Sequence, residues 1–100
     1  MAELEIIVTD EGDHGAYRAN VEGSDRQAEL TWRSVARGDG DVRNANHTFT
    51  PPEARGKGIA LKLVESMIAD AREQEFKIVP GCPYVAAQFD KHPDWADLRA

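Results

Sequence analysis

The chain contains 100 residues, of which 41 % are hydrophobic and 30 % are charged, and its formal net charge at pH 7 is −6. This length and composition predict a single domain over residues 1–100 with one modest core, and they exclude an intrinsically disordered protein. The acidic balance disfavours non-specific binding to nucleic acid or to an anionic membrane, although it is compatible with a cationic partner such as an amine.

The single cysteine, Cys82, excludes a disulfide within the chain. No Cys and His pairs have the spacing of a zinc site, so no metal centre is expected. The sequence shows neither an apolar leader segment nor a run long enough to cross a membrane. We therefore expect a cytoplasmic protein.

The first half of the chain alternates short runs of strand-forming residues with clusters of turn residues. Ala28, Leu30 and Trp32 occupy alternate positions, which is the period of a strand with one buried face. Similar runs, joined by links of hairpin length, predict an antiparallel meander. Its strands span residues 3–8, 16–21, 28–33 and 42–49, with turns at 10–15, 22–25 and 37–41.

A long amphipathic helix and a shorter one follow the meander. Between residues 57 and 74 apolar side chains recur at helical spacing. This face comprises Ile59, Leu63, Val64, Met67, Ile68 and Ala71. A short fifth strand over residues 76–79 comes next. Pro83 suits the first turn of a second helix over residues 83–91, and a last turn spans residues 94–99.

The loop between the fourth strand and the long helix, residues 50–60, combines the features of an anion site. Gly56 and Gly58 allow the backbone to approach a ligand closely, and the first amide groups of the helix point out of its start. These amides and the positive end of the helix dipole attract an anion, and Arg55 and Lys57 add full charges. We interpret the loop as a cradle for a diphosphate; the alternative is an ordinary loop that leads into the helix.

Two well-known phosphate-binding patterns do not fit this loop. A P-loop requires a glycine where Pro51 stands and a Ser or Thr where Gly58 stands. A dinucleotide fingerprint requires a third glycine where Leu61 stands. The spacing that remains, Arg55-x-x-Gly58-x-Ala60, resembles the R/Q-x-x-G-x-G/A signature with which the GNAT superfamily of N-acetyltransferases holds the pyrophosphate of acetyl-CoA.

Further short motifs extend the resemblance over most of residues 29–98. His47-Thr48 precedes the loop, and Pro80-Gly81-Cys82-Pro83-Tyr84-Val85, His92-Pro93 and Asp97-Leu98 follow the long helix. The same order is found in a subfamily of compact, single-domain GNAT-like proteins of similar length. The resemblance implies an α+β fold: a mixed, mostly antiparallel five-stranded sheet with one long central helix and a short C-terminal helix.

The resemblance also implies how acetyl-CoA is held. In the GNAT fold the fourth and fifth strands splay apart, and the pantetheine arm of the cofactor enters that gap with its thioester near the end of the fourth strand. The residues that would bind acetyl-CoA or CoA are Thr48, Phe49, Thr50, Arg55, Gly56, Lys57, Gly58, Ile59, Ala60, Cys82 and Tyr84.

Three side chains are candidates for chemistry. His47 is the candidate catalytic base, because a histidine accepts a proton near neutral pH; the alternative is a strand-end histidine bonded to the backbone. Cys82 is the second candidate catalytic residue, because the start of a helix favours a thiolate. The resemblance places it near the CoA thiol, as a covalent acceptor of acetyl or as the acid for the leaving thiolate; the alternative is an inert packed cysteine. Tyr84 is either an additional acid or a packed aromatic.

Together these features predict an acetyl-CoA-dependent N-acetyltransferase that acts on an unidentified amine, either a small amine or a protein lysine. Full-length GNAT enzymes insert two helices between their first strands to help build the acceptor pocket, whereas this chain has only a short turn there. The alternative is therefore a CoA- or acyl-CoA-binding module without turnover, or a small interaction protein.

Overall fold

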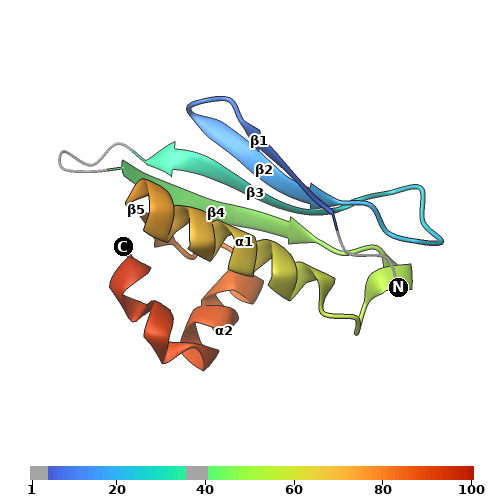
Figure 1. The fold of residues 1–100 in the computed structure, drawn as a ribbon. Helices are drawn as coiled ribbons and strands as arrows, with labels where there is room; N and C mark the ends of the chain where they lie inside the picture. The colour runs from blue at the N-terminus through green and yellow to red at the C-terminus, as the bar shows by residue number, and fades with distance from the viewer. Residues whose placement is uncertain (1–4, 36–40) are drawn as a thin grey trace.

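The computed structural model describes residues 5–35 and 41–100 and shows a sheet backed by helices (Figure 1). The strands follow one another across the sheet in the order β1-β2-β3-β4-β5. They are β1 (Ile6–Asp10), β2 (His14–Ala19), β3 (Ala28–Val35), β4 (Asp41–Phe49) and β5 (Phe76–Val79). The helices are α1 (Ile59–Gln74) and α2 (Pro83–Lys91), with short 3₁₀ helices η1 (Pro52–Ala54) and η2 (Pro93–Leu98).

The sheet combines a meander with one parallel pair. Strands β1 to β4 pair antiparallel with their sequence neighbours, whereas β5 pairs parallel to β4. A parallel pair needs a crossover connection, and α1 provides it. The structure therefore confirms the predicted fold class, a mixed and mostly antiparallel five-stranded sheet with one long helix and a short C-terminal helix.

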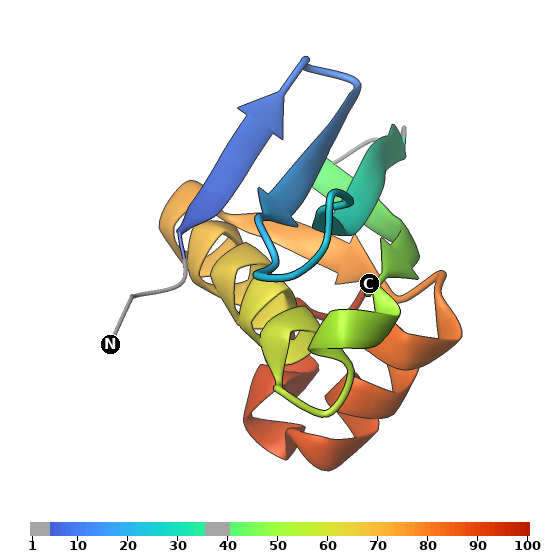
Figure 2. The same ribbon diagram turned by 90° about the vertical axis from the view of Figure 1, so that its right-hand side faces the viewer.

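The helices lie on one side of the sheet, and the core fills the space between the two layers (Figure 1, Figure 2). Alternation along β2 and β3 turns Tyr17, Leu30 and Trp32 toward this core, where each is at most 1 % exposed. No helix of the described residues covers the other side, which we call the open side. The buried side chains of α1 confirm the predicted apolar face: Leu63, Val64, Met67, Ile68 and Ala71, with Ile59 packed against the core.

The first hairpin is tighter than predicted. β1 continues to Asp10 and β2 begins at His14, so the connection is shorter than the predicted turn. The turn closes because Gly12 adopts a φ of 92° and its N–H donates to Asp10 Oδ1 at 2.8 Å. Residues 3–4 of the predicted first strand and residues 37–40 of the predicted third turn lie outside the described residues.

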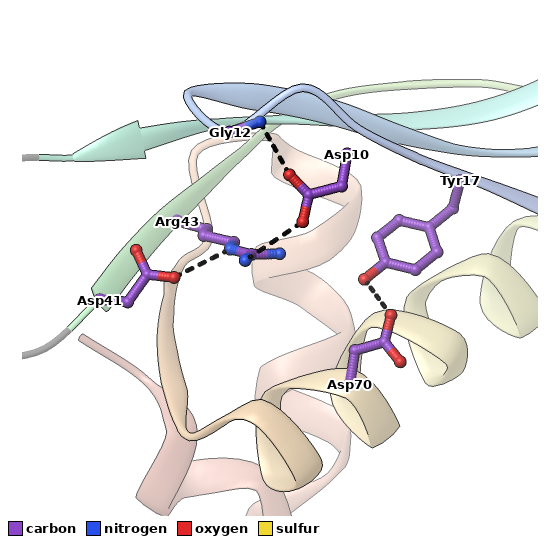
Figure 3. A network of polar contacts seen from close by, with 6 residues as sticks. All are labelled: Asp10, Gly12, Tyr17, Asp41, Arg43 and Asp70. Atoms are coloured by element: carbon purple, nitrogen blue, oxygen red, sulfur yellow. Dashed lines mark hydrogen bonds and ion pairs between the residues drawn. The ribbon is translucent and has the colours of Figure 1, made fainter.

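A buried arginine of β4, Arg43, contacts the end of β1 and the start of β5, and Figure 3 shows its contacts with Asp10 and Asp41. Arg43 is 8 % exposed, and its guanidinium lies 4.1 Å from the ring centroids of both Trp32 and Phe76. Arg43 Nε donates to Asp41 Oδ2 at 3.2 Å, and Arg43 Nη2 lies 3.7 Å from Asp10 Oδ2. Cation–π contact and ion pairing together stabilise a charge that would be costly to bury alone.

A second polar contact joins the sheet to α1. Tyr17 Oη donates to Asp70 Oδ2 at 2.7 Å (Figure 3). Burial, followed by the hydrogen bond to the Asp70 carboxylate, raises the pKa of Tyr17, so the phenol stays protonated at neutral pH. The contact fixes the second half of α1 over β2.

The C-terminal segment packs against the rest of the helical layer and along β5. Trp95 meets Phe89 edge to face with ring centroids 5.8 Å apart, and it stacks on His92 at 4.0 Å. The N–H of Ala100 donates to Ile78 O at 2.8 Å, so the segment also runs beside the sheet. Among the described residues, no helix has both the length and the apolar character that a membrane span requires.

Candidate functional site

β4 and β5 pair only over the first part of β4. The parallel ladder runs from Asp41 opposite Phe76 to Asn44 opposite Val79. β4 then continues to Phe49, while the chain leaves β5 and turns toward α2. The second half of β4 therefore has β3 on one edge and no strand of the described sheet on the other.

A bulge in β4 determines which side chains face this opening. In the pairing of β3 with β4 the register shifts between Thr31 and Trp32, and Asn46 is the extra residue in β4. Thr31 Oγ1 donates to Asn46 Oδ1 at 2.7 Å beside the bulge. A one-residue bulge exchanges the two faces of the strand for every residue beyond it.

Beyond the bulge, the neighbours His47 and Thr48 face opposite sides of the sheet. Thr48 pairs with the core residue Leu30 and faces the helical side. His47 pairs with Thr31 and faces the open side. The two residues therefore meet different surroundings although they are adjacent in sequence.

Cys82 is the N-cap of α2 and lies beside Thr48. Its Sγ is 3.3 Å from Thr48 Oγ1, and the residue is only 8 % exposed. Burial by itself raises the pKa of the thiol. The Thr48 hydroxyl and the backbone N–H groups of Val85 and Tyr84 outweigh burial, so the pKa of Cys82 lies below its ordinary value of 9.0. The sulfur makes no N-cap hydrogen bond, so we attribute the effect of these amides to the electrostatics of the helix start.

Alkylation of Cys82 by iodoacetamide is expected to have a pH midpoint below 9.0, because the thiolate is the reactive species and a lowered pKa makes it appear at lower pH. Thr48→Val removes the hydroxyl and should move the midpoint upward. The measurement is the alkylation rate against pH by mass spectrometry, with Thr9→Val on β1 as the matched control. A midpoint that Thr48→Val leaves in place would contradict the role of the hydroxyl.

The loop before α1 encloses a hollow of about 350 Å³, which we call the α1 hollow. After η1, Gly56 and Gly58 have φ values of 83° and 74°, in the left-handed region that favours glycine. Because Gly58 is left-handed, α1 begins at Ile59 rather than at the predicted Lys57. The hollow is lined by Thr50, Ala54, Arg55, Gly56, Gly58, Ile59, Ala60 and Tyr84.

The start of α1 presents unpaired donors at this hollow. The N-cap Gly58 makes no side-chain capping bond. Within the described part of the chain, the amide N–H groups of residues 58–61 have no hydrogen-bond acceptor. Unpaired amides at the positive end of a helix dipole form an anion site.

The predicted cofactor contacts divide into those that line the α1 hollow and those that do not. Arg55 lines it, and Arg55 Nε donates to Thr50 O at 3.4 Å, which places the guanidinium beside the loop. Lys57 is exposed in the same loop but is not part of the lining. The Phe49 ring lies 4.1 Å below the guanidinium carbon of Arg26 instead.

His47 lies apart from Cys82, on the open side. Its side chain is 56 % exposed, and its Nε2 is 3.6 Å from Glu29 Oε2. Glu29 Oε1 is in turn 3.5 Å from Arg18 Nε. Sequence reasoning missed Glu29, because its approach to His47 depends on the register of β3 against β4 and no local motif signals it.

Asn44 belongs to the last residue pair before β4 and β5 separate. A Cβ at Gly81 would lie 2.1 Å from Asn44 Oδ1, so this close approach requires glycine. Asn44 Oδ1 is buried and has no hydrogen-bond partner among the described residues. A buried acceptor without a donor suits a ligand N–H that enters the opening. Sequence reasoning missed Asn44, and the glycine before Cys82 was the available signal.

A comparison with known families identifies the class of protein. A family model described as GCN5-related N-acetyl-transferase matches residues 16–98, which extend from within β2 to the end of η2. The chain belongs to this family, and the resemblance noted in the sequence is confirmed. Membership supports an acetyltransferase type of function.

Proposed function

We propose that the chain is an acetyl-CoA-dependent N-acetyltransferase that acetylates an amine. The observation that carries the proposal is the set of unpaired amide donors of residues 58–61 beside the α1 hollow, which Arg55 and Tyr84 also line. The family match supports the same class of reaction. Acetyl-CoA supplies the acetyl group as a thioester, and its thiolate is the leaving group.

The loop before α1 would hold the diphosphate. The amides of residues 58–61 donate to its oxygens, and the helix dipole adds to the attraction. Arg55 and Lys57 compensate its negative charge. The free edge of β4 and the buried Asn44 Oδ1 offer hydrogen bonds to the amide groups of the pantetheine arm. The residues present therefore fit the cofactor.

Cys82 and Thr48 would act at the thioester, beyond the point at which β4 and β5 part. In direct transfer the Cys82 thiol protonates the leaving thiolate. In the covalent route the Cys82 thiolate would form a C–S bond to the acetyl carbon as the C–S bond to CoA breaks and CoA leaves as its thiolate. Acetyl-CoA alone should then leave an acetylated Cys82 visible by intact-mass analysis, whereas unmodified protein would select direct transfer. Burial raises the pKa of Tyr84, so this residue keeps its proton and is the alternative acid.

His47 would remove the proton from the amine on the open side of β4. The Glu29 carboxylate, 3.6 Å from His47 Nε2, stabilises the positive charge that the ring acquires. In direct transfer the N–C bond forms as the C–S bond to CoA breaks, His47 takes the amine proton, and the proton for the leaving thiolate comes from Cys82. The base, His47, and the acid, Cys82, would thus act from opposite sides of β4.

Gly58→Ala is expected to weaken binding of acetyl-CoA about tenfold, because the new Cβ forces the start of α1 to move and misdirects its amides. The measurement is a calorimetric titration with acetyl-CoA. Gly23→Ala is the matched control, since Gly23 has a similar φ of 86° and equally open space around it but lies in the β2–β3 connection. Each change should cost about 1 kcal/mol of stability. No detectable affinity in the parent protein would overturn the proposal.

A second candidate is a CoA-binding module without turnover. It is favoured by the placement of His47 and Thr48 on opposite sides of the sheet, which separates the candidate base from Cys82. Acetyl transfer to a panel of amines, followed by a coupled assay for free CoA, distinguishes the two. Transfer that is lost in both His47→Ala and Cys82→Ala excludes the second candidate, and tight CoA binding without any transfer selects it.

A further inference from the structure

The open side of the sheet carries a hollow of about 570 Å³, here called the open-face hollow. It is built from β1 to β4, and Ala16 at its floor is only 3 % exposed although no described helix covers this side. Sites for small molecules commonly have volumes of about 300–1,000 Å³. The side chains at its walls include His14, Arg18, Thr31, Arg33, Asn46 and His47.

One cation of this hollow remains available to a ligand. Arg18 is engaged by Glu29 at 3.5 Å, and His14 Nδ1 lies 2.7 Å from Asp13 Oδ1. Arg33 is exposed and forms no direct ion pair with any residue that the structure describes, although its charge, after that of His14, helps to lower the pKa of the Asp13 carboxyl. A guanidinium in this state is well suited to a carboxylate or a phosphate. The exposed Arg33 guanidinium therefore points to an anionic group on the ligand.

The positions of Arg33 and His47 set the length of that ligand. Thr31 pairs with His47 across β3 and β4, and Arg33 lies two residues farther along β3 on the same side. Two residues of a strand span about 7 Å. An anion held by Arg33 therefore leaves room for a nitrogen near His47 at about that distance. Glu11 also lines the hollow and repels anions, so one anionic group that Arg33 offsets is more favourable there than two.

We propose that the open-face hollow is the acceptor site and that the acceptor is a small primary amine with one carboxylate or phosphate about 7 Å from its nitrogen. The inference rests on the acetyl transfer proposed above and specifies its substrate class. Arg33 binds the anion, and His47 takes the proton of the amine as the N–C bond forms and the C–S bond to the donor breaks. The proton for the leaving thiolate comes from Cys82.

The first test measures binding without acetyl-CoA, so its result does not depend on turnover. The probe is ε-aminocaproate, followed by backbone-amide NMR, with hexylamine, hexanoate and glycine as comparisons. ε-Aminocaproate should shift the amides of residues 31–33 and 46–47 and bind more tightly than the other three. Arg33→Gln should weaken binding about tenfold, whereas Arg99→Gln, an exposed arginine in the C-terminal segment, should not. An amino-phosphonate of equal length tests the phosphate class.

Absence of shifts at these amides with every probe overturns the proposal. Shifts by a lysine-containing peptide when the small amines fail would assign the site to a protein partner and also overturn it. The second test is transfer: Arg33→Gln should raise KM for ε-aminocaproate about tenfold and leave kcat unchanged. Equal transfer to hexylamine, insensitive to Arg33→Gln, overturns the acceptor class and leaves the acetyltransferase function intact. If ε-aminocaproate binds but no amine is acetylated, the result overturns the acetyltransferase function and, with it, the role of the open-face hollow as an acceptor site.

Discussion

His47→Ala is expected to lower kcat for acetyl transfer about 100-fold or more while the affinity for acetyl-CoA stays unchanged. A positioned general base contributes about 10²- to 10⁴-fold to a rate. The cradle should be unaffected, because His47 faces the open side whereas Thr48 and Cys82 meet on the helical side. The measurement is kcat at saturating amine, with a separate titration of acetyl-CoA.

Chemical rescue provides the control for this variant. The imidazole of His47 is more than half exposed, so its removal should leave space that free imidazole can enter from solvent. Added imidazole should restore part of the turnover of His47→Ala and have no effect on Cys82→Ala. Near-parental turnover in His47→Ala would show that the base lies elsewhere, and loss of acetyl-CoA affinity would show that the variant has disturbed the loop.

Arg43→Ala is expected to lower the free energy of unfolding by about 3 kcal/mol. The change removes the guanidinium between Trp32 and Phe76 and leaves a cavity between the two rings. It also removes the ion pairs to Asp41 and Asp10. Since small domains are stable by only about 5–15 kcal/mol, this loss is a large share of the total. Urea unfolding followed by far-UV circular dichroism measures it.

Two variants separate packing from charge at this position. Arg43→Met keeps an unbranched apolar chain between the rings and should recover part of the loss. Arg33→Ala removes an exposed arginine from the neighbouring strand and should change the stability by no more than about 0.5 kcal/mol. If Arg43→Ala is as stable as Arg33→Ala, the buried cluster contributes little to the fold.

The sequence predicted the structure correctly where the spacing of apolar residues alone determines which face of an element is buried. The spacing of Leu63, Val64 and Met67 predicts the buried face of α1 without knowledge of the sheet. The burial of Arg43 could not be predicted in this way. In the sequence of β4, Arg43 is one polar residue among several. Only the folded structure brings the rings of Trp32 and Phe76 to its guanidinium.

In the candidate site, too, some features could be predicted from the sequence and others could not. Gly56 and Gly58 before an amphipathic helix predict a loop with free amides, and the structure places both residues in the left-handed region. The separation of His47 from Cys82 was not foreseeable. Strict alternation from Ala45 would turn His47 toward the helical side, and the bulge at Asn46 turns it away. A bulge depends on long-range strand pairing, so residues near it in sequence do not signal it.

The bulge affects which substitutions and deletions β4 can tolerate. Substituting Asn46 loses one side-chain contact but leaves the residue count of β4 intact, so the strand should tolerate it. Deleting Asn46 would remove the extra residue and restore strict alternation, and it would still leave His47 opposite Thr31 on the open side and Thr48 opposite Leu30 on the helical side. A deletion between His47 and Phe49 would instead turn the residues that follow it to the other face, so β4 should tolerate loss of the bulge residue better than loss of a residue beyond it.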